Sequence, residues 1–475
     1  MIPAVTILEA MSHPDLWARW FRDPATWAPW RTFLAALFGL PMSDDDLALF
    51  QQCTGRATAP TAGFTAAWLV VGRRGGKSMI LAVIAVYLAT FRDWRPYLSP
   101  GEVGAVKIIA TDRRQARVIH RYCRALLREV PVLSELIERE DDDAILLKTG
   151  IVIEIQTASF RSVRGYTVIG GFIDEIAYLR TDEGSANPDS EIIAALRPAM
   201  ATIPGAMLLC ASSPYARRGE LWNAYRRHFG HDDAPALVWQ ADTRTMNPTV
   251  SQSVVDEAMD RDPASAAAEY GAQFRTDIES FVSREVVEAA VVPGVFELPP
   301  ISSLSYIAFV DPSGGSADSM TLAIAHAEDD GTRAIVDAVR EVRPPFSPEA
   351  VVIEFADLLK TYSVYTVVGD RYAGEWPRER FREHGIEYEP AEKPKSDIYR
   401  ELLPLLNSRK VELPDDDRLV AQLVSLERRT ARGGRDSIDH PPGAHDDRAN
   451  AVAGAVVLAA GKGDPLAVWR RLITD

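Results

Sequence analysis

The feature that most constrains this chain is the alternation of short apolar runs with helix-patterned segments between residues 66 and 241. Amphipathic stretches such as 113–130, whose apolar residues recur at helical spacing, separate several of the runs. Continuous apolar strands alternating with helices are typical of a mainly parallel sheet covered on both faces. We therefore predict an α/β fold, with strands at 66–71, 105–110, 151–156, 167–173, 206–211 and 236–241.

Composition limits the class of protein. The chain has 475 residues, enough for roughly two to four domains. Its 52 Lys and Arg against 67 Asp and Glu give a net charge of −15, which excludes a histone-like or ribosomal protein but not a locally basic groove. The 3 scattered cysteines argue against a disulfide framework or a zinc site.

The N-terminus lacks a signal-peptide pattern and the apolar stretch 451–460 is too short to span a bilayer, so we expect a cytoplasmic protein without a membrane partner.

A Gly-rich turn, GRRGGKS, follows the first apolar run and precedes a helical pattern. Its glycines allow backbone amides to converge on phosphate oxygens: Gly72, Gly75 and Gly76. Lys77 would reach the β- and γ-phosphates of ATP, and the Ser78 hydroxyl would bind Mg²⁺. The first glycine lies one place later than GxxxxGK[ST] requires, so an ordinary Gly-rich turn is the alternative.

Two arginines within this loop, Arg73 and Arg74, are unusual. They would bind the nucleotide and stabilise charge developing on the γ-phosphate, as an arginine finger does. Solvent-facing side chains are the alternative interpretation.

The apolar run 167–173 ends in Asp174 and Glu175. In a P-loop sheet this strand end lies beside the phosphates, so Asp174 would hold Mg²⁺ and Glu175 would orient the attacking water. The segment ASSP, 211–214, would sense the γ-phosphate or simply end its strand. Arg164 precedes the acidic strand and is either a structural arginine or one that meets a neighbouring subunit's nucleotide.

A second acidic set stands far along the chain. Asp311 and Asp370 end apolar strands, and Asp446 and Asp447 begin the last helical pattern. Carboxylates that converge in this way suit two Mg²⁺ or Mn²⁺ ions about 4 Å apart, which together hydrolyse a phosphodiester. Each acid alone could be a turn former or a helix cap. Lesser candidates are Asp318 and His445, the latter as a supporting group or an exposed histidine.

These motifs divide the chain into a P-loop ATPase and a ribonuclease-H-like α/β nuclease. The expected boundaries are a helical N-terminal extension at 1–60, the ATPase domain at 61–275, a Pro/Gly-containing linker at 276–303, the nuclease domain at 304–465 and a tail at 466–475.

The combination resembles the large terminase subunit of tailed bacteriophages over roughly residues 60–465. GRRGGKS resembles that family's arginine-bearing Walker A loop, GGFIDE its Walker B strand and ASSP its coupling motif. DPSGG, VVGDR and GAHDDRANAVAGA resemble its three nuclease motifs, although the family often has another acid in place of Asn450. That departure leaves open which of Asp446 and Asp447 binds metal, and we favour Asp446. The resemblance also implies that Arg164 acts on a neighbour's ATP.

The resemblance implies a motor that pushes double-stranded viral DNA into a procapsid through its portal and cuts concatemeric DNA. Its expected partners are a small terminase subunit, the portal protein and further copies in a ring, commonly a pentamer, although it could be a monomer in solution. Its expected location is the host cytoplasm and, transiently, the portal vertex. Arginine clusters near 113–117, 217–227 and 428–435 would contact DNA or form solvated helix faces.

The same motifs are compatible with two other functions. One is a P-loop DNA translocase or helicase whose C-terminal domain binds DNA without cutting it. The other is a nucleotide-binding structural adaptor without turnover, against which the intact Lys77, Asp174 and Glu175 argue.

Overall fold

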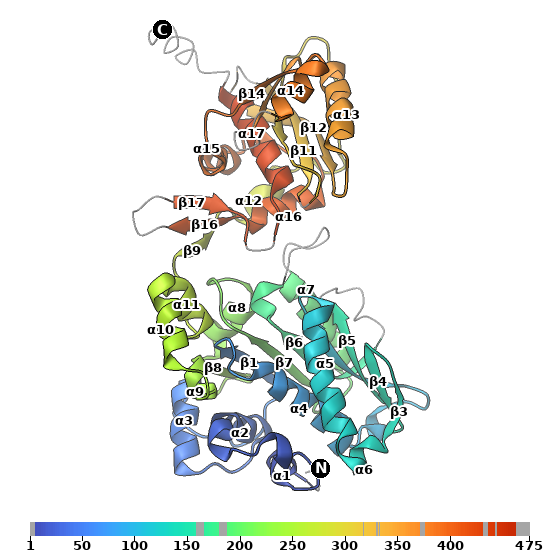
Figure 1. Ribbon diagram of the computed structural model, residues 1–475, viewed down its shortest axis with the longest axis vertical. Coiled ribbons are helices and arrows are strands. Elements are labelled where there is room, and N and C mark those ends of the chain that lie inside the picture. Colours follow the sequence, from blue (N-terminus) through green and yellow to red (C-terminus); the bar gives the residue numbers. More distant parts are fainter. Residues whose placement is uncertain are drawn as a thin grey trace. The chain divides into compact units, whose positions relative to one another are not determined.

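The computed structural model describes residues 5–157, 166–179, 188–316, 318–328, 331, 333–370, 376–430, 436–441 and 444–461. The chain divides into two compact units between Thr276 and Asp277, and both are drawn in Figure 1. Among the described residues no helix combines the length and the apolar character needed to cross a bilayer.

The first unit contains a mainly parallel sheet, with eight strands in its described part, ordered β3-β4-β5-β2-β6-β7-β1-β8. Neighbours from β5 to β8 in this order pair in parallel, and only the β3–β4 hairpin and its junction with β5 are antiparallel. The predicted parallel sheet is therefore confirmed. The strands are β1 (Ala66–Val71), β2 (Gly104–Ala110), β3 (Ile137–Glu140), β4 (Ala144–Leu147), β5 (Ile151–Thr157), β6 (Thr167–Asp174), β7 (Met207–Ser212) and β8 (Leu237–Ala241).

Helices cover both faces of this sheet (Figure 1). Along β1 the side chains alternate, so that Leu69 and Val71 join the core under α2 to α5, while Trp68 and Val70 join the core under α7 and α8. The helices of the unit are α1 (Ile7–Ser12), α2 (Pro24–Phe38), α3 (Asp44–Thr54), α4 (Lys77–Phe91), α5 (Arg113–Arg128), α6 (Pro131–Ser134), α7 (Pro188–Met200), α8 (Gly219–His228), α9 (Thr243–Met246), α10 (Gln252–Arg261) and α11 (Pro263–Glu269), with short 3₁₀ turns at Ala18–Trp20, Arg95–Tyr97 and Ile176–Tyr178.

The order β6-β7-β1 decides where the site of this unit lies. Because these neighbours are parallel, their carboxyl ends meet at one edge of the sheet. Val70 of β1 pairs with Ser212, and Asp174 of β6 pairs with Ala211. The loop after β1 is thereby brought beside the ends of β6 and β7.

The second unit contains a mixed sheet, with six strands in its described part, ordered β14-β13-β10-β11-β12-β15. β11 is antiparallel to β10 and β12, whereas β13 and β14 continue in parallel from β10, which is the ribonuclease-H-like arrangement. The strands are β10 (Tyr306–Asp311), β11 (Met320–Glu328), β12 (Arg333–Val342), β13 (Thr366–Gly369), β14 (Glu387–Pro390) and β15 (Val411–Glu412). A small antiparallel sheet comprises β9 (Ile278–Ser280), β16 (Glu427–Thr430) and β17 (Asp436–Asp439).

The helices of this unit are α12 (Arg284–Glu288), α13 (Pro348–Thr361), α14 (Trp376–Glu383), α15 (Lys395–Asn407), α16 (Asp417–Ser425) and α17 (Asp447–Gly461). One face of the sheet packs on α13 and α14, the other on α15 to α17. α17 lies close to β10 at Gly454, where an added Cβ would come within 2.3 Å of the Phe309 ring. This close packing fixes the start of α17 near the end of β10.

The expected linker at 276–303 is wrong in its first half. β9 pairs with β16, and the side chains of Phe281, Val282 and Val287 are buried in the core of the second unit. The Pro and Gly residues that suggested a linker begin only at Pro293. The apolar residues before them lower the free energy of the folded chain when they are buried in a core. The expected tail, 466–475, lies outside the described residues.

Candidate active sites

The Gly-rich loop joins the end of β1 to the start of α4. Gly76 precedes the helix with a φ of +100°, a conformation that favours glycine, and no side chain caps this helix start. An added Cβ at Gly72 would lie 2.3 Å from Thr243 Oγ1, so glycine is required there as well. The first amides of α4 have no partner within the helix and are available to an anion.

Three side chains outside the loop hold it in place. The indole N–H of Trp30 on α2 donates to the Gly75 carbonyl at 2.8 Å. Thr243 Oγ1 donates to the Arg73 carbonyl at 2.8 Å, and Asn247 Nδ2 donates to the Arg74 carbonyl, also at 2.8 Å. None of these residues was predicted from the sequence, because no local signal connects them with the loop.

The predicted ATPase residues converge at the sheet edge. The ammonium of Lys77, which is 5% exposed, donates to the carbonyls of Val71 at 2.9 Å and Gly72 at 3.3 Å. It lies 3.8 Å from Glu175 Oε1. Ser78 Oγ donates to Asp174 Oδ2 at 3.2 Å, as expected of two groups that share a metal ion.

Glu175 is held in an unusual backbone conformation. Its φ of 51° and ψ of 44° lie in the left-handed region, which costs a non-glycine residue energy and is often found at functional sites. Ser212 Oγ donates to Glu175 Oε2 at 2.9 Å, so a hydroxyl of the ASSP segment contacts the predicted catalytic carboxylate.

The carboxylate of Asp174 lies near both a negative and a positive group, Glu175 and Lys77. Burial, and then the neighbouring Glu175, raise the pKa of Asp174, while Lys77 and Ser78 oppose the shift. A buried carboxylate whose charge is disfavoured is stabilised by a cation. The uncapped helix start, Lys77, Ser78 and Asp174 therefore fit a nucleotide with its Mg²⁺.

Arg73 of the loop forms an ion pair, and Arg74 has an unusual backbone conformation. The guanidinium of Arg73 lies 3.2 Å from both carboxylate oxygens of Glu269 on α11, and this carboxylate raises the pKa of Arg73. Arg74 has a positive φ of 65°, and its backbone carbonyl is bound by Asn247. Arg164 lies outside the described residues.

The predicted nuclease residues of the second unit also converge. A cavity of about 340 Å³ is lined by acids from the ends of β10 and β13 and from the start of α17, which are Asp311, Asp370, Asp446 and Asp447. Asp318 and His445 also line it, and their side chains lie 3.3 Å apart.

The two consecutive acids at the start of α17 differ in their partners. Lys395 Nζ lies 3.0 Å from Asp446 Oδ2, and Tyr399 donates its hydroxyl to the same oxygen at 2.8 Å. Asp447 Oδ2 is buried and has no hydrogen-bond partner among the described residues. Asp447 thus has a buried oxygen without a partner in the described part of the chain, whereas one oxygen of Asp446 already meets two donors.

Asn450, where the resembled family often has an acid, belongs to the same cavity. Its Nδ2 donates to Asp311 Oδ2 at 2.9 Å, and its Oδ1 is another buried oxygen without a partner in the described part of the chain. Unpartnered buried oxygens of Asp447 and Asn450 among several carboxylates are what a Mg²⁺ or Mn²⁺ ion requires. The donor set fits the expected divalent metals.

The raised pKa values of Asp311 and Asp447 also indicate that a cation would stabilise their charged forms. Burial raises the pKa of Asp311 well above its usual value, and Asp447 and Asp446 add to the shift. Burial and then Asp446 raise the pKa of Asp447 to about 6. Burial opposes the charge on Lys395, but Asp446 and Asp439 overcome this effect and hold its pKa above the usual range.

Sequence reasoning missed Lys395, Tyr399 and the neighbouring pair Asp439 and His440. Atoms of Asp439, His440 and Asp446 lie within 4.8 Å of one another and could hold a cation, but Lys395 Nζ already lies 2.7 Å from Asp439 Oδ1. Lys395 begins α15, 51 residues before Asp446, so no local signal connects the lysine with the acid.

No protein-family model matches the chain, and no curated protein matches it. Among solved structures it is similar to the large terminase of bacteriophage HK97, at 17% identity and a TM-score of 0.37 over 84% of this chain and 91% of that chain. It is also similar to the large terminase of a thermophilic bacteriophage in complex with ATP-γ-S, at 12% identity and a TM-score of 0.37 over 90% and 96% of the two chains. The large terminase nuclease of thermophilic phage G20c with bound magnesium matches at 18% identity and a TM-score of 0.31 over 36% and 95%.

Replacing Trp30 with Phe should weaken nucleotide binding about two- to tenfold, because the Gly75 carbonyl loses a hydrogen bond that contributes about 0.5–1.5 kcal/mol. Titration with a fluorescent ATP analogue measures the effect. Trp17→Phe is the matched control, since its indole donates to Leu126 away from the loop. Equal affinities for the two variants would show that Trp30 does not support the loop.

Proposed function

We propose that this chain is the large subunit of a bacteriophage terminase, which uses ATP to move double-stranded DNA into a procapsid and cuts that DNA by two-metal hydrolysis. The main observation that supports the proposal is that one chain contains two separate acidic sites. One lies beside an uncapped helix start at the edge of a parallel sheet, the other at the edge of a ribonuclease-H-like sheet. The motifs that resemble the family coincide with these two sites.

In the ATPase site, the amides at the start of α4 and the ammonium of Lys77 would bind the β- and γ-phosphates. Ser78 and Asp174 would hold Mg²⁺, which neutralises charge developing on the phosphates. Glu175 would orient the attacking water and accept its proton. Ser212, bonded to Glu175, would couple loss of the γ-phosphate to movement of β7.

Arginines would complete the ATPase site. Arg73 would exchange its pairing with Glu269 for the γ-phosphate, and Arg164 would act on the ATP of a neighbouring copy in a ring. A ring, commonly a pentamer on the portal, would therefore be the active assembly, with the small terminase subunit supplying DNA recognition in the host cytoplasm.

In the nuclease site, Asp311, Asp370 and Asp447 would hold two Mg²⁺ or Mn²⁺ ions, which activate water and stabilise the leaving oxygen. Asp446 is a positioning residue for Lys395, since it lies 3.0 Å from the ammonium. Lys395 would in turn place a positive charge beside the scissile phosphate. Asn450 would orient Asp311 through its 2.9 Å hydrogen bond.

One observation favours a second function, a DNA translocase whose C-terminal domain does not cut. The Lys395 ammonium and the Tyr399 hydroxyl both bind Asp446, which reduces the number of oxygens open to metal. The nuclease experiment below separates this function from the terminase.

Lys77→Ala and Glu175→Gln should both reduce DNA-stimulated ATP hydrolysis by about 100-fold or more, because each removes a group that acts on the γ-phosphate or its water. Only Lys77→Ala should also weaken ATP binding, because Glu175→Gln keeps the phosphate cradle. Phosphate release and nucleotide titration measure the two effects. Loss of metal-dependent DNA cutting in either variant would argue against independent sites.

Plasmid digestion in Mn²⁺ tests the nuclease. Asp311→Asn and Asp447→Asn should reduce cutting to the level of the buffer control, because each removes a carboxylate expected to bind metal. Asp446→Asn should retain measurable cutting, since its carboxylate positions Lys395 instead. Equal nicking by wild type and Asp311→Asn would point to a contaminant and leave the non-cutting translocase as the function.

A further inference from the structure

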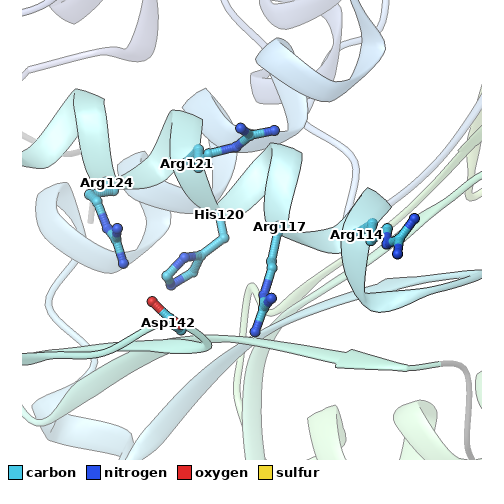
Figure 2. A pocket seen from close by; sticks show the side chains of 6 residues that line it. All are labelled: Arg114, Arg117, His120, Arg121, Arg124 and Asp142. Carbon is cyan, nitrogen blue, oxygen red and sulfur yellow. The ribbon is translucent and has the colours of Figure 1, made fainter.

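Outside the two acidic sites, the first unit has a charged cleft of about 300 Å³ along α5. Figure 2 shows Arg117, His120 and Arg124 extending from α5 toward the β3–β4 hairpin, which carries Asp142. The full lining is Arg114, Arg117, His120, Arg121, Arg124 and Asp142.

The sequence of α5 explains why one face of this helix is so basic. Its apolar residues, including Ile119, Cys123 and Leu126, are buried in the core. The opposite face carries arginines but no acid from the helix itself. From Arg114 on, these arginines are three or four residues apart, and the full set is at positions 113, 114, 117, 121, 124 and 128. A solvated helix face usually mixes both signs of charge, so this one-sign stripe on a chain of net charge −15 is unusual.

Acids of the β3–β4 hairpin hold four of these arginines. Asp143 lies 3.3 Å from Arg113 and 3.2 Å from Arg117. Glu140 lies 2.7 Å from Arg124 and 2.8 Å from Arg128. These four ion pairs join α5 to the β3–β4 hairpin. Two positive charges of the cleft are left over, because within the described residues Arg114 and Arg121 have no ion-pair partner.

The buried base of the cleft includes His120, which is 1% exposed. Burial and then Arg124 lower its pKa, so the ring adds no charge at neutral pH. Its Nε2 has no hydrogen-bond partner among the described residues, whereas nearly all buried polar atoms in proteins are satisfied. This nitrogen is therefore open to a group bound in the cleft.

We propose that this cleft binds the phosphate backbone of double-stranded DNA, an inference that rests on the proposed function. Arg114 and Arg124 are ten residues apart, which is about 15 Å along a helix. Phosphates follow one another at about 3.4 Å of axis per strand, so a linear polyanion can contact the stripe along its length, while a single free phosphate can use only part of it. Arginines that contact phosphates carry no base information, which suits a motor that must move any sequence.

The test measures binding of a short labelled DNA duplex by fluorescence anisotropy over a range of salt concentrations. It uses the full chain in EDTA without nucleotide, so neither cutting nor ATP turnover contributes. Arg114→Ala/Arg121→Ala should reduce the slope of log K against log salt by about 2, since each lost phosphate contact removes about 0.9. Arg114→Lys/Arg121→Lys should restore the slope, because lysine still contacts phosphate as a point charge.

Arg95→Ala/Arg261→Ala is the matched control, because it removes the same charge from exposed arginines outside the cleft. Its slope should equal that of wild type. Basal ATP hydrolysis without DNA should be unchanged in all three variants, which shows that each is folded.

An Arg114→Ala/Arg121→Ala slope equal to that of the control would overturn the inference. If that variant also loses binding of inorganic pyrophosphate, measured by calorimetry, the cleft is a site for a free anion instead. Failure of the proposed function is distinct, since the wild type itself would then not bind the duplex.

Discussion

Both sites depend on one constraint, which is that adjacent parallel strands end at the same edge of a sheet. In the first unit, β1, β7 and β6 are neighbours, so the loop at Gly72, the hydroxyl of Ser212 and the carboxylate of Asp174 are brought together from distant parts of the chain. In the second unit, β10 and β13 pair in parallel and deliver Asp311 and Asp370 to one edge. The close packing of α17 on β10 adds the third acidic element.

The parts predicted from the sequence are those with a local signal. Continuous apolar runs identified the parallel strands, because a strand covered on both faces needs no polar side. The glycines before Lys77 and the acids at 174 and 175 identified the ATPase site, since a loop that approaches phosphates must lack side chains and a metal needs carboxylates. The β3–β4 hairpin was not predicted, because β3 is mostly polar and the apolar run of β4 has only four residues.

The remaining features depend on contacts between residues far apart in sequence. Trp30 supports a loop 45 residues away, and Lys395 reaches an acid 51 residues away. The pairing of Arg73 with Glu269 spans 196 residues, so the loop alone could not reveal it. Likewise, Pro and Gly signalled a linker, whereas the burial of Phe281 and Val287 was decided by the partners they meet in the second unit.

We propose that one chain builds two separate metal-holding pockets. Anomalous diffraction from crystals grown with Mn²⁺ and a non-hydrolysable ATP analogue would locate both. We expect manganese beside Ser78 and Asp174, and again among Asp311, Asp370 and Asp447. Manganese at only one of these places, or bound instead by Asp439 and His440, would show that the chain does not build both pockets.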